Sequence, residues 1–380
     1  MTSITNFSQN KIISATNLIL FILIVPKIDI VSFTNFHQGI RIENLLSLIF
    51  FFIILFNPKK FKINYSDKFF IFCGVIILSY VVGELNEFSL SYITIIRILE
   101  YIILYIFFSN YKLDYGKIIN IFKILIIINV IVCLLQYYNI VGFFSSRGYF
   151  EANYTYWKAA GIFSGSWEVS FISSLLYFVI YHHEKKKINI YFFLTLIILY
   201  LANTRGVMIS FFLSVFILYF RNFKISLLYL FLTPLILYLF YFLVLKYFSI
   251  DIVILFESII RLIFFNQNIF EDLNKFGNQY YSWGIRLGDW LLYANQFNTN
   301  IFTNLFGTGY TAIYYESFIF RILFANGFIG FLILSILIIR IKFYMIIFLL
   351  LTGFTLDFVV SFKMFVILFL YFKYLKFLKK

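Results

Sequence analysis

Several of the 31 Lys and Arg residues stand apart from the lysine-rich short loops, in a chain that is 62% hydrophobic and only 13% charged. Arg205 lies in the tight turn "ANTRG" between two apolar segments. An unpaired cation near membrane depth is energetically costly, so its presence there favours a functional role. Arg147, Lys158 and Arg286 lie in longer polar stretches, where snorkelling or pairing with nearby acids is the alternative. A guanidinium group can bind two phosphate oxygens through parallel hydrogen bonds. These residues therefore predict an anion-binding site.

Two carboxylates, Glu168 and Glu316, stand where a polar stretch enters an apolar segment. Each is a candidate general base, because a carboxylate can take the proton of an attacking hydroxyl group. Helix capping, or pairing with Arg321, is the alternative for Glu316. Asp272 and Asp289 are the remaining candidates for the base.

All four tryptophans fall in or beside two polar stretches: Trp157 and Trp167 in one, Trp283 and Trp290 in the other. Flat rings with a polar edge suit the faces of sugars, and they also suit the membrane interface. Because 23% of the chain is aromatic, a location at the membrane interface is the better explanation for any one ring taken alone. The concentration of all four at two places favours a binding surface.

The sequence lacks the motifs of nucleotide-binding and metal-binding sites. No P-loop or glycine-rich nucleotide motif occurs, and the three histidines form no metal-binding set. Cys73 and Cys133 lie in apolar runs and are expected to be core residues. The net charge of +14 comes mostly from lysines in short loops, so it does not indicate nucleic acid. We therefore expect no metal and no cofactor, and any reaction must draw its energy from its substrate.

Membrane-spanning helices must position these residues, because the apolar residues come in long blocks such as 225–245, which carry no charge. We predict an all-α, polytopic integral membrane protein, a single membrane domain over 1–380 with about twelve transmembrane helices. The predicted spans are 12–28, 40–57, 69–83, 92–108, 118–138, 167–182, 189–203, 206–220, 225–246, 315–338, 343–358 and 363–378.

The distribution of lysine and arginine orients these spans. The basic clusters around Lys59, Lys117, Lys185 and Lys342 all fall on one side, which the positive-inside rule assigns to the cytoplasm together with both termini. The opposite side carries two large loops, 139–166 and 247–314. The second loop contains an amphipathic helix over 276–297 and an interfacial helix with a Glu257–Arg261 pair. Within the bilayer, Arg97 and Glu100 share one helical face and are expected to neutralise each other.

Four segments resemble the Wzy-type O-antigen polymerases and the O-antigen ligases. "NTRGVMISFFLSVFIL" (203–218) is similar to the Ser/Thr-Arg-Gly segment that opens their shared region. "RLGDWLLYANQFNTNIFTNLFGTGY" (286–310) resembles their stretch of Arg, Trp and Gly-x-Gly, and "ESFIFRILFANGFIGFLILSIL" (316–337) resembles the helix that follows. "GIFSGSWEVSF" (161–171) is similar to their earlier Gly-Phe segment. The matches follow the family's order and cover roughly the second half of the chain.

The resemblance implies a membrane glycosyltransferase at the periplasmic face of the bacterial inner membrane. It would move a growing glycan from undecaprenyl diphosphate to the terminal sugar of a new lipid-linked repeat unit, and a chain-length regulator would be a further protein partner. Catalysis would fall to Glu316 as the base and to Arg205 and Arg286 as stabilisers of the leaving diphosphate. Substrate binding would fall to Arg147, Lys158, Trp167, Glu168, Trp283, Trp290 and Arg321.

Two other activities remain open at this stage. An O-antigen ligase would usually carry a His-Asn pair where this chain has Glu316-Ser317, which favours the polymerase. A flippase or other transporter of lipid-linked oligosaccharides also has about twelve spans. It needs a cavity across the bilayer and seldom a large one-sided loop, so the loops 139–166 and 247–314 favour a surface enzyme.

Overall fold

The structure is a computed structural model that describes residues 16–378 with several gaps. The gaps are 20, 35–37, 59–60, 62–66, 111–112, 146–157, 186–187, 221–253, 255–256, 258–259, 262–277, 311–316, 340 and 356–360.

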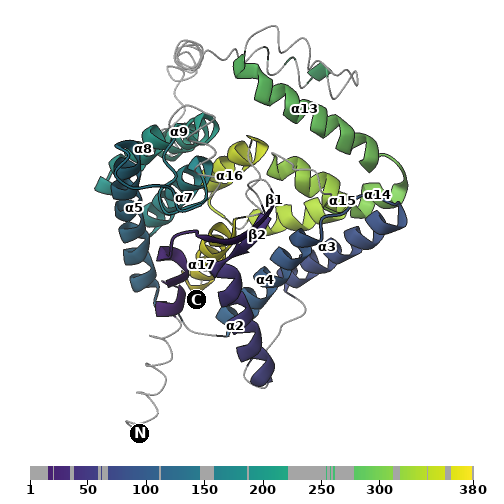
Figure 1. Ribbon diagram of the computed structural model, residues 1–380, viewed down its shortest axis with the longest axis horizontal. Helices are drawn as coiled ribbons and strands as arrows, with labels where there is room; N and C mark the ends of the chain where they lie inside the picture. The colour runs from purple at the N-terminus through teal and green to yellow at the C-terminus, as the bar shows by residue number, and fades with distance from the viewer. Residues whose placement is uncertain are drawn as a thin grey trace. The chain divides into compact units, whose positions relative to one another are not determined.

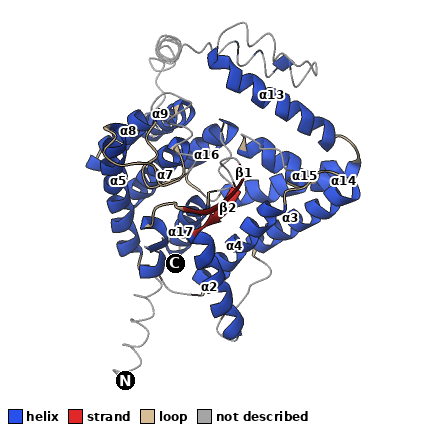
Figure 2. Ribbon diagram, viewed as in Figure 1, coloured by secondary structure: helices blue, strands red, loops and turns tan. Residues whose placement is uncertain are grey.

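Helices make up most of the described chain, and the described part also contains one short β-hairpin (Figures 1 and 2). The elements in order are β1 (Asp29–Thr34), β2 (Gln38–Arg41), α2 (Ile42–Phe56), α3 (Lys68–Leu85), α4 (Tyr92–Ser109), α5 (Tyr115–Tyr137), α7 (Ser166–Glu184), α8 (Ile190–Ala202), α9 (Arg205–Phe220), α13 (Asn278–Phe297), α14 (Ile301–Phe306), α15 (Phe318–Ile338), α16 (Phe343–Thr355) and α17 (Phe362–Leu378).

Three described helices, α3, α5 and α15, are long and apolar enough to cross a membrane. Shorter apolar helices accompany them in α2, α8, α9 and α16. Uninterrupted apolar runs favour helices here, because a helix satisfies its own backbone hydrogen bonds without water. The coarse prediction of a mainly helical membrane protein is therefore supported, while the number of crossings stays a prediction.

Helices occupy the predicted span positions, to within a few residues, with two exceptions. The predicted span 225–246 lies outside the described residues, and 12–28 is described only in part. The hairpin of β1 and β2 was not predicted: it pairs Asp29 with Arg41 in antiparallel register, in a stretch expected to be a short outer loop.

The chain divides into two compact units. Unit 1 contains residues 1–73, 91–214 and 335–380, and unit 2 contains residues 74–90 and 215–334. Three of the four boundaries fall inside α3, α9 and α15, so these helices contribute residues to both units, and the fourth lies between α3 and α4. The prediction treated the chain as one membrane domain.

In unit 1, α2, α4 and α17 run in the same direction. Phe50 of α2 stacks on Phe107 of α4, with ring centroids 4.5 Å apart, and Asn44, earlier in α2, contacts Glu100, earlier in α4. Along α4 and α17 the order of contacts also rises together, from Tyr101 with Phe365 to Tyr105 with Phe369, Phe108 with Phe369 and Lys373 with the Phe108 carbonyl.

The helices α5 and α7 of unit 1 run in opposite directions. Lys123, near the start of α5, pairs with Glu184 at the end of α7, at 2.5 Å. Gln136, at the other end of α5, donates to the Gly161 carbonyl just before α7. Helix α7 is parallel to α17, because Glu168 contacts Ser361 and His182 contacts Tyr371.

In unit 2, helix α15 is broken at Gly327. Its φ of 67° and ψ of −177° lie in a region that only glycine adopts readily. The break leaves carbonyls without helical partners, and the chain after α14 fills the gap. Thr308 N–H donates to the Phe324 carbonyl at 2.9 Å, and Gly309 N–H donates to the Ala325 carbonyl at 3.0 Å. The glycines of "GTGY", both with positive φ, thus let the backbone after α14 lie against the broken helix.

Candidate functional site

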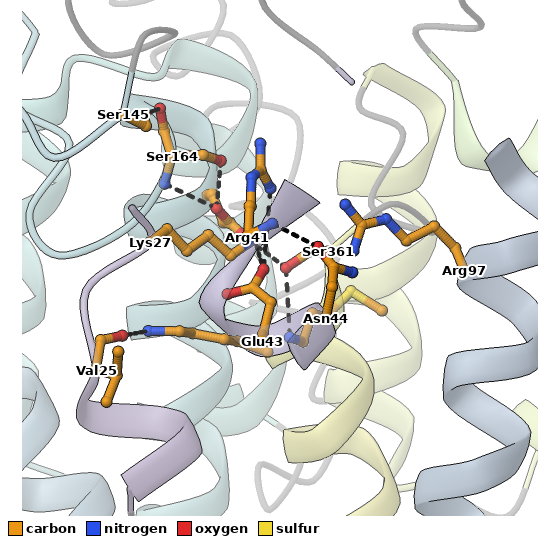
Figure 3. A network of polar contacts seen from close by, with 12 residues as sticks. Val25, Lys27, Arg41, Glu43, Asn44, Arg97, Ser145, Ser164 and Ser361 are labelled. Atoms are coloured by element: carbon orange, nitrogen blue, oxygen red, sulfur yellow. Dashed lines mark hydrogen bonds and ion pairs between the residues drawn. The ribbon is translucent and has the colours of Figure 1, made fainter. Parts of the chain in front are cut away.

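A cluster of charged and polar side chains is buried inside unit 1, and we call it the ionic cluster (Figure 3). It gathers the N-terminal segment, the hairpin and the first turns of several helices. Its members are Lys27, Arg41, Glu43, Asn44, Arg97, Glu100, Ser164, Glu168, Ser361 and Lys363.

The centre of the ionic cluster is the ion pair of Lys27 and Glu168. The Lys27 ammonium lies 2.6 Å from the Glu168 carboxylate, and both side chains are fully buried, at 1% and 0% exposure. The other carboxylate oxygen accepts from the backbone N–H and the hydroxyl of Ser164, at 3.0 and 2.5 Å. The Ser361 hydroxyl completes the set. Burying a charge is costly unless it is paired and hydrogen-bonded, and Glu168 meets both conditions.

A second carboxylate, Glu43, lies beside the same ammonium group. Its Oε1 is 3.7 Å from Lys27 Nζ and 3.9 Å from Arg41 Nη1, and it accepts no hydrogen bond within the described chain. Asn44 links this part of the cluster to α4, because it accepts from the Arg41 backbone N–H and donates to Glu100. Glu43 lies in the first turn of α2, where the helix dipole favours a negative charge.

The predicted neutralising pair in α4 is present. Arg97 Nη1 lies 3.1 Å from Glu100 Oε2, and the two side chains are largely buried. The prediction did not include their place at the edge of a larger cluster. The last cation of the ionic cluster is Lys363. It donates to the backbone carbonyls of Leu23 and Val25, where the N-terminal helical segment ends. A lysine is well suited to bind such carbonyls, because they have no helical partner.

The segment 159–170 joins the ionic cluster to the turn that carries Arg205. Ala159 N–H donates to the Leu201 carbonyl at 3.1 Å, and the hydroxyls of Ser170 and Thr204 are 3.2 Å apart. Helix α5 supports the same segment, since Gln136 and Asn129 accept from the backbone N–H groups of residues 160–162.

Glycine is required at position 161 of this segment. Its φ is +59°, and a side chain there would collide with Asn129. Gly161 in "GIFSGSWEVSF" therefore allows close packing against α5.

The predicted site residues of unit 1 fall into two groups. Trp167 and Glu168 are buried at 6% and 0% exposure, which fits a structural role better than the predicted contact with a sugar. Arg205 begins α9 and is exposed, and Lys158 is half-buried just ahead of the segment that contacts the Arg205 turn. Of the predicted anion-binding residues, Arg205 and Lys158 are thus brought to neighbouring parts of one unit.

In unit 2, Arg321 of the broken helix α15 and Trp290 of α13 are both buried. The Arg321 guanidinium lies 4.7 Å from the centre of the Tyr310 ring, and the Tyr310 hydroxyl accepts from Asn326 at 2.8 Å. Trp290 packs on Phe320 with centroids 4.4 Å apart. The amphipathic helix predicted over 276–297 is present as α13, and its buried face, which includes Tyr293, packs on α15.

The other predicted site residues are less fully described. Arg286 and Trp283 belong to α13, and their side chains are not described. Arg147, Glu316 and Asp272 lie outside the described residues, so their roles stay predictions. Of the predicted interfacial helix 251–265, four residues are described, and Arg261 pairs with Glu257 at 2.6 Å as expected.

Sequence reasoning missed most of the ionic cluster. Lys27 and Lys363 sit at the ends of apolar runs, where a lysine ordinarily marks the end of a span. Lys27 pairs with Glu168 across 141 positions of sequence, and Lys363 binds the Leu23 carbonyl across 340, so only the fold reveals these contacts. Among the described residues, no three His, Cys, Asp or Glu side chains gather as metal ligands would.

Comparison with known proteins found no match to any family model, curated protein or solved structure.

Proposed function

We propose that the chain is a membrane glycosyltransferase that polymerises lipid-linked glycan repeats. The observation that carries this proposal is how the four segments resembling O-antigen polymerases pair in space. Segment 161–171 contacts the start of 203–218 through Ser170 and Thr204 in unit 1. Segment 286–310 contacts 316–337 through Thr308 and Phe324 in unit 2. Segments that resemble one family and also pack together are better candidates for a shared site than isolated matches.

The directions of the helices support the proposed topology of about twelve crossings with both termini in the cytoplasm. The predicted spans that become α2, α4, α7 and α17 all run from the outer to the inner side, and their contacts make them parallel. The proposed outer ends meet in the ionic cluster. The proposed inner ends of α5 and α7 meet at Lys123 and Glu184. The membrane would be the bacterial inner membrane, and the site would face the periplasm.

The proposed reaction needs no nucleotide or metal. A hydroxyl oxygen of the acceptor's terminal sugar attacks the anomeric carbon of the donor glycan, and the bond from that carbon to the diphosphate oxygen breaks. Undecaprenyl diphosphate leaves with the electron pair, and a base takes the hydroxyl proton. Arg205, exposed at the start of α9, would stabilise the charge on the diphosphate, with Arg286 as its predicted partner. Glu316 is the proposed base.

A transporter of lipid-linked oligosaccharides is the second candidate, and two observations favour it. Buried ionisable groups in membrane helices often mark transport pathways, and the ionic cluster is one such set. Broken helices such as α15 occur at the binding sites of transporters. Here, however, the break is filled by the backbone of Thr308 and Gly309, and the central carboxylate of the cluster, Glu168, is fully hydrogen-bonded.

Deletion of the gene in its own bacterium separates the candidates by the glycan that remains. A polymerase mutant should carry single repeat units attached to the cell surface. Lipid-linked polymer that accumulates unattached would indicate a ligase, and the absence of any periplasmic glycan would indicate a flippase. Either of the last two outcomes would overturn the proposed function.

A further inference from the structure

Lys27 contacts the segment 159–170 at two points, one before α7 and one in its first turn. Its backbone N–H donates to the Ile162 carbonyl at 3.0 Å, and its side chain pairs with Glu168 at 2.6 Å. One residue thus holds two points of the chain, Ile162 and Glu168, that are six positions apart in sequence. Lys27 is 1% exposed, so water does not compete for either contact.

Helix α17 locks Lys27 in place. Lys363 binds the carbonyls of Leu23 and Val25, just upstream of Lys27, and Ser361 donates to the same carboxylate that Lys27 binds. The N-terminal segment, α7 and α17 are therefore joined in a closed ring of contacts. A ring of this kind fixes position better than a single pair, because no member can move without breaking two contacts.

The held segment lies directly against the turn of Arg205. Ala159 bonds to Leu201 on one side of the segment, and Ser170 bonds to Thr204 on the other. Thr204 is the residue before Arg205. A shift of the segment would therefore carry the Arg205 backbone with it, and small misplacements of a catalytic group lower rates strongly.

We infer that Lys27 is a positioning residue that sets the placement of Arg205 through the Glu168 ion pair and the segment 159–170. This inference rests on the proposed function for its catalytic consequence. The structural part, that Lys27 fixes the segment against the Arg205 turn, stands without it. Lys27 itself touches no substrate in this role.

The structural part is tested by cross-linking. Replacing Cys73 and Cys133 with Ala, and then introducing Ser170→Cys and Thr204→Cys, puts one thiol pair where the two hydroxyls are 3.2 Å apart. Mild oxidation of the full chain in membranes should join most of this pair. Lys27→Met should lower the cross-linked fraction several-fold, because a buried carboxylate without its cation drives the segment to rearrange.

Lys123→Met is the matched control. It also removes the lysine of an ion pair to α7, at 2.5 Å from Glu184, but that pair is partly exposed and lies at the opposite end of the helix. Its cross-linked fraction should equal that of the parent. A Lys27→Met fraction that also equals the parent, in correctly inserted protein, would overturn the inference.

Lys27→Met combined with Glu168→Gln keeps the inference testable if the single variant fails to insert. The double variant removes both charges of the Lys27–Glu168 pair together, and the Gln amide keeps hydrogen bonds to Ser164 and Ser361. It should insert normally and give an intermediate cross-linked fraction. Cross-linking equal to the parent would show that the ion pair does not position the segment.

Turnover per folded molecule tests the catalytic part. With lipid-linked repeats as substrate, Lys27→Met should lower kcat at least tenfold and leave KM nearly unchanged, whereas a purely structural role would lower only the amount of folded protein. Loss of cross-linking with unchanged turnover would contradict the link to Arg205. If the parent itself polymerises nothing, the proposed function fails, and cross-linking still decides the role of Lys27.

Discussion

At the residue scale, the sequence predicted that Glu168 lies at the start of a membrane helix, but it did not predict which residues bind its carboxylate. The sequence marked it as a carboxylate at a membrane entrance, yet its oxygens are bound by Lys27, Ser164 and Ser361. Ion pairs between positions 141 residues apart depend on the whole fold, so no local pattern announces them. Arg97 and Glu100, by contrast, are three residues apart on one helix, and helical geometry alone predicted their contact.

Arg205 is the residue whose loss should be most specific. Arg205→Ala should leave the protein inserted, because the side chain is exposed and little packing is lost. Polymer synthesis should fall by about 100-fold or more, the usual effect of removing a group that stabilises developing charge. Arg205→Lys should restore only part of it, because an ammonium group cannot form two parallel hydrogen bonds to a diphosphate. Polymer length on gels measures the effect, and full-length glycan from Arg205→Ala would show that the residue only anchors the turn.

Glu316 is the proposed base, and Glu316→Gln keeps its shape while removing its ability to take a proton. The purified variant should bind lipid-linked repeats and form no polymer. Binding is measured with a labelled repeat unit, and synthesis is measured on gels. Asp289→Asn serves as the comparison, since Asp289 was the less favoured candidate on α13. Normal rate and chain length from Glu316→Gln would make Glu316 structural and leave the base to be sought elsewhere.

At the element scale, long apolar runs were enough to locate the helices. They did not reveal the break in α15, because "FANGFIGF" continues an apolar helical pattern on both sides of Gly327. The hairpin of β1 and β2 was missed for a related reason: a stretch of a dozen residues between two apolar runs was treated as a plain loop. The break depends on the backbone conformation of a glycine, and the hairpin depends on which strands pair. A hydropathy pattern contains neither kind of information.

Gly327→Ala should destabilise the protein by about 2 kcal/mol or more. The backbone conformation there is nearly restricted to glycine, and a side chain would collide with the Leu305 carbonyl. Gly74→Ala is the matched control: this helical glycine has open space around it, so Ala should be neutral or stabilising by up to about 1 kcal/mol. Thermal unfolding of the two purified variants in the same detergent measures the difference. Equal unfolding temperatures would contradict the description of the break.

At the scale of the whole molecule, charge patterning supplied the proposed orientation, which stays a prediction, and the helix contacts show that α2, α4, α7 and α17 run in the same direction. Composition could not predict the two compact units, because both contain apolar helices and they share α3, α9 and α15. Arg205 belongs to unit 1 and Arg286 to unit 2.

The orientation is tested with reporter fusions along the chain. Fusions after residues 65, 115, 186 and 222 should report cytoplasm, and fusions after 155 and 280 should report periplasm. The reason is that the lysine-rich loops stay on the side where the chain is synthesised. A periplasmic signal after residue 186 would contradict both the proposed crossings and the outward placement of the ionic cluster, because residue 186 follows directly on the end of α7.

Synthesis of polymer by the purified chain tests the central claim most directly. The full-length protein in lipid vesicles is supplied with undecaprenyl-diphosphate-linked repeat units from its own bacterium, without nucleotides, and the products are separated by size. The proposed function predicts a ladder of glycans that grows by one repeat per step and is absent with Arg205→Ala. Repeat units that stay single with the unaltered protein, or that only cross the vesicle membrane, would contradict it.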